Sequence, residues 1–206
     1  MIQISTRNSM IVLALAALSS TASLAKAAPV VGQAAPGFTA KDSNGETHTL
    51  EQFKGKYVVL EWLNHGCPYV KKHYNSKNMQ QLQKQWTDKG VVWLSVVSSA
   101  KGKQGYQTPD ETNATKQEKG SQASAILLDP EGDLGRLYAA RTTPQMFVID
   151  PRGVLIYAGA IDDKASTNVR DVPGATNYVS AALDAALAGK KVEVTTTRPY
   201  GCSVKY

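Results

Sequence analysis

Two uninterrupted apolar runs stand out along the chain, at residues 57–63 and 91–97. Their length and their content of β-branched and aromatic residues are typical of buried strands. Between them, residues 68–86 place apolar side chains at helical spacing, which predicts one long helix. Shorter apolar segments predict strands at 126–128, 146–149 and 154–157 and helices at 134–140 and 178–187. This alternation predicts an α/β protein whose central mixed sheet is flanked by helices on both faces.

Polar segments divide the rest of the chain. Apolar and polar residues on either side of the Asn44-Gly45 pair predict an N-terminal hairpin extension, because Asn-Gly supplies the positive φ of a tight turn. Residues 99–123 are polar and are interpreted as an insertion with one helix that begins near Thr108. We therefore expect one domain at residues 28–190, followed by a tail at residues 191–206.

Residues 1–27 have the pattern of a signal peptide. Arg7 precedes an apolar core at residues 10–18, and Ala25-Lys26-Ala27 fits the small-residue cleavage motif. The apolar core is too short to span a bilayer comfortably. We therefore predict a periplasmic or secreted protein that has no contact with the membrane after cleavage.

Charge and cysteine content narrow the function further. The chain has 23 basic and 17 acidic residues, a net charge of +6, and its lysines are dispersed. A nucleic-acid partner is not expected, because such binders gather basic residues in a patch or stripe. Both cysteines, Cys67 and Cys202, lie in the part predicted to be exported, where disulfides persist.

The strongest chemical signal is Cys67, between the first apolar run and the predicted helix. Pro68 follows it directly, and proline is favoured at the first position of a helix. Cys67 is therefore expected at the N-cap, where free backbone N–H groups and the helix dipole favour a thiolate. His65 and Lys71 are expected to add positive charge and to tune the thiol. These features predict a reactive cysteine.

Three segments together resemble the thioredoxin-like superfamily: residues 31–38, the strand–Cys67–helix unit, and residues 142–153. The closest resemblance is to exported redoxins, which group alkyl hydroperoxide reductase/thiol-specific antioxidant (AhpC/TSA) domains with TlpA-like oxidoreductases. The resemblance implies the thioredoxin-like fold. It also implies that Pro144 is cis and faces the redox cysteine. Thr143 and Pro144 would then dock the extended chain of a partner by β-type hydrogen bonds.

The departures from that family are informative. Val70 stands where the second cysteine of a C-x-x-C motif belongs, so local dithiol exchange is impossible. Leu60 and Asn64 replace the proline and threonine of the peroxiredoxin motif, and Pro144 stands where peroxiredoxins place an arginine. Cys202 is the only other thiol. Three possibilities stay open for it: redox-active pairing with Cys67, a structural staple, and no pairing within the chain.

Two further residues have alternative interpretations. Glu61, inside the first apolar run, is either a buried carboxylate that relays protons to Cys67 or an exposed residue of an edge strand. His65 and His73, on either side of Cys67, suggest a copper site of the kind found in Sco-like chaperones, although the second cysteine and the downstream histidine of those proteins are missing. We expect no metal and assign His65 to thiol tuning.

These observations lead to one hypothesis with two alternatives. We expect a thiol–disulfide oxidoreductase with Cys67 as nucleophile and Cys202 as candidate resolving thiol, acting on protein thiols or disulfides. The first alternative is a thiol-dependent peroxidase that reduces a hydroperoxide. The second is a non-catalytic module that binds a partner or copper. Either enzyme would use an external thiol reductant, and none of the three requires an organic cofactor.

Overall fold

The computed structural model describes residues 1–2 and 28–206. The predicted signal peptide, at residues 1–27, therefore lies almost entirely outside the described residues. Within the described part of the chain, no helix is long and apolar enough to cross a membrane.

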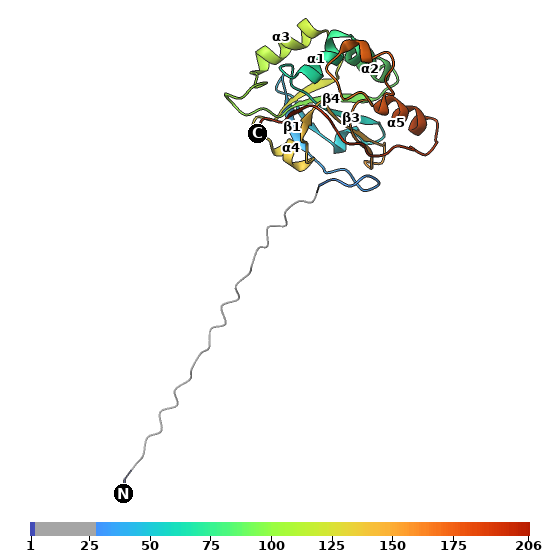
Figure 1. The fold of residues 1–206 in the computed structure, drawn as a ribbon. Helices are drawn as coiled ribbons and strands as arrows, with labels where there is room; N and C mark the ends of the chain where they lie inside the picture. The colour runs from blue at the N-terminus through green and yellow to red at the C-terminus, as the bar shows by residue number, and fades with distance from the viewer. Residues whose placement is uncertain (3–27) are drawn as a thin grey trace.

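A seven-stranded mixed sheet forms the centre of the molecule (Figure 1). Its strand order is β2-β1-β5-β4-β3-β7-β8. Strands β3, β4 and β5 are parallel, and every other neighbouring pair is antiparallel. The predicted mixed sheet is thereby confirmed. The strands are β1 (Thr39–Asp42), β2 (Thr47–Thr49), β3 (Val58–Trp62), β4 (Val92–Val97), β5 (Ala125–Leu128), β7 (Gln145–Ile149) and β8 (Leu155–Gly159).

Helices cover both faces of this sheet, as predicted. In Figure 1, α1 and α2 lie above the sheet and α4 lies below it. Thr108 caps α3 through a reciprocal pair of hydrogen bonds with Glu111, so the predicted start of the helix in the polar insertion is confirmed. The helices are α1 (Pro68–Asn75), α2 (Asn78–Thr87), α3 (Pro109–Lys119), α4 (Asp133–Leu137) and α5 (Tyr178–Leu187), with 3-10 turns η1 (Glu51–Phe53) and η2 (Val169–Asp171).

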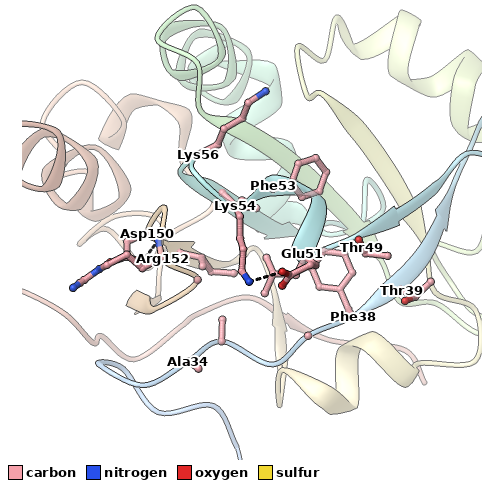
Figure 2. A pocket seen from close by; sticks show the side chains of 16 residues that line it. Ala34, Phe38, Thr39, Thr49, Glu51, Phe53, Lys54, Lys56, Asp150 and Arg152 are labelled. Atoms are coloured by element: carbon pink, nitrogen blue, oxygen red, sulfur yellow. Dashed lines mark hydrogen bonds and ion pairs between the residues drawn. The ribbon is translucent and has the colours of Figure 1, made fainter.

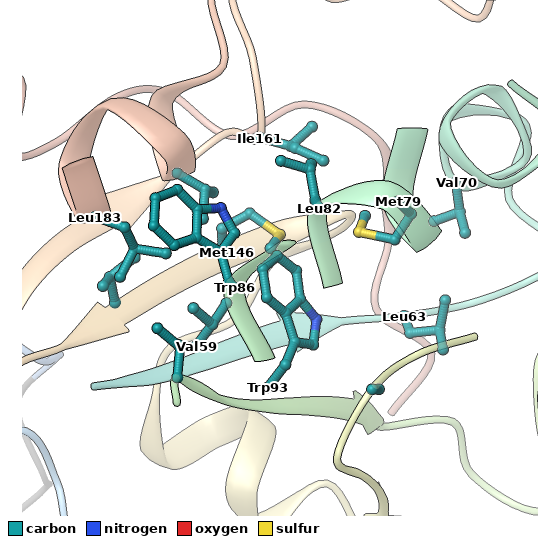
Figure 3. Close-up of a cluster of buried hydrophobic side chains, with 14 of the residues drawn as sticks. Val59, Leu63, Val70, Met79, Leu82, Trp86, Trp93, Met146, Ile161 and Leu183 are labelled. Atoms are coloured by element: carbon teal, nitrogen blue, oxygen red, sulfur yellow. The ribbon is translucent and has the colours of Figure 1, made fainter. Parts of the chain in front are cut away.

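Each face of the sheet has its own apolar core, because alternate residues of a strand point to opposite faces. On one face, the side chains of β3, β4 and β7 pack against α1, α2 and α5 (Figure 3). Trp86 of α2 and Trp93 of β4 are fully buried there. On the other face, Trp62 and Phe147 pack against Tyr138, which follows α4. All three tryptophans are therefore part of the core.

The single long helix predicted at residues 68–86 is wrong, because the structure divides it into α1 and α2. Lys77 adopts a left-handed conformation with φ 63° between them. The Ser76 hydroxyl donates hydrogen bonds back to the carbonyls of Lys72 and His73. Side chains of this type compete with the helical backbone pattern, which explains why apolar spacing alone did not reveal the break.

The predicted tail folds back onto the domain. It first follows β8, where the Thr197 backbone N–H donates to the Ala158 carbonyl at 3.2 Å. It ends in the short strand β9 (Cys202–Ser203), which pairs antiparallel with β6 (Thr142–Thr143). The register places Cys202 opposite Thr143. The second cysteine therefore reaches the neighbourhood of the predicted cis-proline.

Candidate redox site

Cys67 occupies the predicted position at the start of α1. Strand β3 ends at Trp62, and a turn at residues 64–66 brings the chain to Cys67, whose N–H donates to the Asn64 carbonyl at 2.9 Å. Cys67 is the N-cap with extended φ and ψ, and Pro68 is the first helical residue. Its side chain is fully buried, with an exposed fraction of 0%. The sulfur thus lies at the positive end of a helix and away from water.

The Thr143–Pro144 peptide bond is cis, as the resemblance implied. The Cys67 Sγ lies 3.0 Å from the Thr143 carbonyl oxygen, and in the thiol form it donates a hydrogen bond to it. Thr143 is itself only 3% exposed, and its hydroxyl has no hydrogen-bond partner among the N and O atoms of the described residues. The two residues predicted to dock a partner therefore border the thiol directly.

Cys202 reaches the same place from the tail. Because it pairs with Thr143 across β6 and β9, its side chain meets the sulfur of Cys67, and both cysteines are free thiols. The Cys202 thiol donates a hydrogen bond to the Cys67 sulfur when the latter is a thiolate. The structure thus brings together the two cysteines that lie 135 positions apart in the sequence.

The pKa values of the two thiols are shifted in opposite directions. Burial raises the pKa of Cys67, but hydrogen bonds from the Cys202 thiol, from the backbone of Val70 and Cys202 and from Thr143 lower it to a net value below the ordinary one. Burial, together with the hydrogen bond to Cys67 and the charge of its thiolate, raises the pKa of Cys202 to about 11. Cys67 is therefore the thiol that ionises first, as a nucleophile must.

Replacing Cys202 with alanine should raise the pKa of Cys67, because the thiolate loses its thiol donor. A hydrogen bond to a charged group contributes about 1.5–3 kcal/mol, which corresponds to about one to two pH units. The measurement is the rate of alkylation at Cys67 against pH, followed by peptide mass spectrometry. Cys202→Ser is the matched control, since its hydroxyl still donates and should shift the midpoint less. An unchanged midpoint in both variants would contradict the assigned donor.

His65 does not carry the positive charge expected of it. Burial, together with the charge of Lys119, lowers the pKa of His65 to about 4, so the imidazole is neutral at pH 7. Its ring packs edge-on against Tyr74 with 4.7 Å between centroids. The Lys71 side chain is exposed, and its ammonium makes no hydrogen bond or ion pair within the described part of the chain. Tuning of the thiol by Lys71 stays a prediction.

Glu61 is a buried carboxylate, as one of the two interpretations predicted. The alternative, an exposed residue of an edge strand, is wrong. Its carboxylate accepts hydrogen bonds from the side chains of Tyr74, Gln83, Trp93 and Ser95 at 2.8–3.1 Å. Burial raises the pKa of Glu61, and these donors oppose the rise. No hydrogen bond of residues 28–206 joins this network to Cys67, so its proton-relay role stays a prediction.

A buried polar cluster beside the tail was missed by sequence reasoning. Lys72 is only 1% exposed, lies 3.5 Å from the Asp162 carboxylate and donates to the Lys164 carbonyl at 2.6 Å. Tyr200 donates its hydroxyl proton to Asp162, and its hydroxyl lies 3.3 Å from His73 Nε2. The spacing of apolar residues contains no signal for this cluster, because Asp162 and Tyr200 lie far along the chain from α1.

An open cavity of about 660 Å³ lies away from the two cysteines (Figure 2). It is lined by Val58, at the beginning of β3, whereas Cys67 follows the end of the same strand. Its Lys54 is paired with Glu51, and its Arg152 is paired with Asp150. Because its charges are largely compensated and no thiol lines it, this cavity is not part of the redox site.

No group of three or more histidine, cysteine or acidic side chains gathers within the described residues in a way that could hold a metal ion. The suggested copper site would draw its ligands from His65, Cys67 and His73, but the Nδ1 of His73 lies 2.9 Å from the Asn78 amide nitrogen and its Nε2 lies 3.3 Å from the Tyr200 hydroxyl. The buried Nε2 of His65 has no hydrogen-bond partner among the described residues, and its ring packs against Tyr74. The reactive groups that the described residues bring together at this site are the thiols of Cys67 and Cys202.

Comparison with known proteins agrees with this description. The pattern of the AhpC/TSA family matches residues 31–158. The thioredoxin-like protein YneN of Bacillus subtilis is 30% identical over 143 residues, which cover 65% of this chain and 74% of that protein. An uncharacterized conserved protein from Geobacillus kaustophilus has a TM-score of 0.72 at 24% identity, covering 86% of this chain and 92% of the other.

A second structural neighbour is the thioredoxin domain of a thiol–disulfide oxidoreductase from Bacteroides vulgatus. Its TM-score is 0.51 at 20% identity, covering 70% of this chain and 96% of the other, so this likeness concerns the fold. The sheet, the cysteine at the start of α1 and the cis-proline define a thioredoxin-like redoxin. Within that class, the chain belongs to the AhpC/TSA family.

Proposed function

We propose that this protein is an exported thiol–disulfide oxidoreductase in which Cys67 is the nucleophile and Cys202 is the resolving thiol. The observation that carries the proposal is the register of β6 and β9, which sets Cys202 opposite Thr143 and against the Cys67 sulfur. The signal-type pattern at residues 1–27 supports a periplasmic or secreted location. The substrates in this proposal are protein thiols and disulfides, as for other thioredoxin-like proteins.

In the first step, the Cys67 thiolate attacks one sulfur of the partner's disulfide. A mixed disulfide forms at Cys67, and the partner's other sulfur leaves as a thiolate. In the second step, the Cys202 thiolate attacks the Cys67 sulfur, the Cys67–Cys202 disulfide forms, and the partner's second sulfur leaves. The partner gains two electrons, and the protein loses two. An external thiol reductant then restores the two free thiols.

The acidities of the two thiols support this order of events. Burial is the largest of the causes that raise the pKa of Cys202 to about 11. The next two are the hydrogen bond to Cys67 and the charge on Cys67. Both of these disappear when Cys67 enters a mixed disulfide, because its sulfur is then neutral. The pKa of Cys202 should therefore fall only after the first step, so the resolving thiolate forms when it is needed.

Peroxidase activity is the second candidate, and membership of the AhpC/TSA family favours it. The residues around Cys67 argue against it. Asn64, in place of the peroxiredoxin threonine, directs its side chain to the Gly66 N–H and to the Gln104 carbonyl rather than toward a peroxide. Pro144 takes the place of the arginine. The groups that activate peroxide in typical peroxiredoxins are therefore absent from these positions.

A kinetic comparison tests both candidates. We expect the reduced protein to react with a small aromatic disulfide on the order of a hundredfold faster than free cysteine at equal thiolate fraction, because the site positions the disulfide against the sulfur. Oxidation by hydrogen peroxide should match that of free cysteine. Both reaction rates are measured by stopped-flow mixing with thiol quenching. The rate of the Cys67→Ser variant gives the part of each reaction that is due to Cys202.

The other outcomes have distinct meanings. Peroxide oxidation orders of magnitude faster than that of free cysteine would reverse the ranking of the two enzymes. If both reactions match free cysteine, the site is not catalytic, and the fold serves as a binding module instead.

A further inference from the structure

The tail occupies the edge at which a partner would dock. Strand β9 pairs with β6 in antiparallel register, with Cys202 opposite Thr143 and Ser203 opposite Thr142. This is the β-type pairing by which an extended peptide binds an exposed strand. Cys67 is 0% exposed under this cover. A partner can therefore reach the sulfur only when residues of the tail leave the edge.

Contacts on both sides of β9 hold the tail in this place. Upstream, Tyr200 is bound to the buried Asp162 and packs its ring against Tyr69 at 5.7 Å between centroids. Downstream, the Val204 N–H donates to the Arg141 carbonyl at 3.0 Å. The downstream residues are half-buried or exposed, and Tyr206 is 42% exposed. The downstream side is therefore the side that can separate from β6 while Tyr200 stays bound.

Two further hydrogen bonds belong to the downstream attachment. The Ala100 N–H donates to the Lys205 carbonyl at 2.8 Å, and the Tyr206 hydroxyl donates to the Ala140 carbonyl at 2.8 Å. Together with the bond at Val204, they lie at a partly exposed surface, where the Arg136 guanidinium also stands 5.3 Å from the centroid of the Tyr206 ring and Val204 packs against the second core. Removal of one of them should shift the tail measurably toward the open arrangement.

Gly201, directly before Cys202, is required by the geometry of this edge. A Cβ at this position would collide with the Thr143 carbonyl oxygen and would lie 2.7 Å from the Thr143 carbonyl carbon. Both of these are backbone atoms, so no side chain can move to make room. The φ of Gly201 is 141°, a conformation that residues with a side chain rarely adopt. Only glycine allows a cysteine to follow in this register.

We propose that residues 201–206 are a built-in pseudo-substrate, and that β6 accepts in their place an extended segment of a partner protein in which glycine directly precedes the cysteine. This inference rests on the proposed function. A partner cysteine that joins Cys67 must place its sulfur where the Cys202 sulfur lies, so the residue before it meets the Thr143 carbonyl. When the tail returns to β6, it brings Cys202 to the mixed disulfide and displaces the partner.

Peptide disulfides test this selectivity. The probes are acetyl-Pro-Tyr-X-Cys-Ser-Val-amide peptides with X as glycine, alanine or valine, each carrying thionitrobenzoate on its cysteine. In the full-length Cys202→Ser variant, the Cys67 thiolate attacks the peptide sulfur, the mixed disulfide forms, and coloured thionitrobenzoate leaves. Rates are divided by those of the same peptides with free cysteine. We expect the glycine peptide to react at least about tenfold faster than the alanine peptide, and the valine peptide to be slowest.

Equal normalised rates for the three peptides would overturn the proposed selectivity while leaving the proposed function intact. If neither the peptides nor a small aromatic disulfide reacts, the proposed function fails, and the inference fails with it. Mass spectrometry of the product shows that the peptide is attached to Cys67. These outcomes therefore distinguish a failure of the proposed selectivity from a failure of the proposed function.

A second set of variants, also in the Cys202→Ser protein, tests displacement of the tail. Val204→Pro removes the N–H that bonds to Arg141, and we expect the rate with the glycine peptide to rise by about fivefold to tenfold. Tyr206→Phe removes only a hydroxyl and should give a smaller rise. Val194→Pro is the matched control, because Val194 is an exposed valine of the same tail, upstream of Tyr200. Rates that stay unchanged in both downstream variants would show that the tail does not compete for the edge.

Discussion

In an oxidising dithiol buffer, the reduced protein should form a single intramolecular disulfide between Cys67 and Cys202. The pairing of β6 with β9 sets Cys202 opposite Thr143, whose carbonyl oxygen lies 3.0 Å from the Cys67 sulfur, and Cys67 lacks a nearer partner because Val70 stands in the C-x-x-C position. Peptide mapping under non-reducing conditions detects the bond, and titration against a dithiol redox buffer measures its reduction potential. A working bond should have a potential above about −300 mV, since structural disulfides lie below that value.

Single-cysteine variants separate the roles of the two thiols. Cys202→Ser should stop after the first step and accumulate one equivalent of mixed disulfide at Cys67. Cys67→Ser should lose exchange activity down to the background of a free thiol, because Cys202 does not lie at the helix N-terminus that stabilises a thiolate at Cys67. Equal trapping by both variants would contradict the assignment of nucleophile and resolving thiol. A potential below about −300 mV would instead mark a structural staple.

Replacing Glu61 with alanine should lower the free energy of unfolding by about 3–5 kcal/mol, a change typical of breaking a buried charged network. Four side chains donate hydrogen bonds to this carboxylate, and all of them would lose their acceptor in a site without water access. The lost side-chain volume adds a cavity between β3 and the helices above it. The measurement is equilibrium unfolding in urea of the fully reduced protein.

The matched control for this prediction is Glu193→Ala. Glu193 is exposed in the tail, and exposed substitutions of this kind usually change stability by less than about 0.5 kcal/mol. A change below about 1 kcal/mol in Glu61→Ala would contradict the stabilising role of the network. Measuring the alkylation midpoint of Cys67 in Glu61→Gln would add a separate test of the predicted proton relay, which requires that midpoint to move.

Local patterns in the sequence were sufficient to predict the backbone elements that surround Cys67. Strand β3, the turn before Cys67 and Pro68 at the first helical position are adjacent in the chain, so their arrangement follows from short-range preferences of the backbone. The cis bond at Pro144 was inferred from the resemblance of residues 142–153 and is present. The break between α1 and α2 was not predicted, because it depends on hydroxyl hydrogen bonds rather than on apolar spacing.

The sequence by itself determined the fold class, the position of Cys67 at a helix start and its isolation from any neighbouring cysteine, because each of these depends on residues close together in the chain. Tertiary structure alone decided that Cys202 meets Cys67, that His65 is neutral and that Tyr200 is bound to Asp162. These features depend on burial and on contacts between distant segments. The periodicity of apolar residues indicates which side of an element faces the core, but not which distant polar group meets it there.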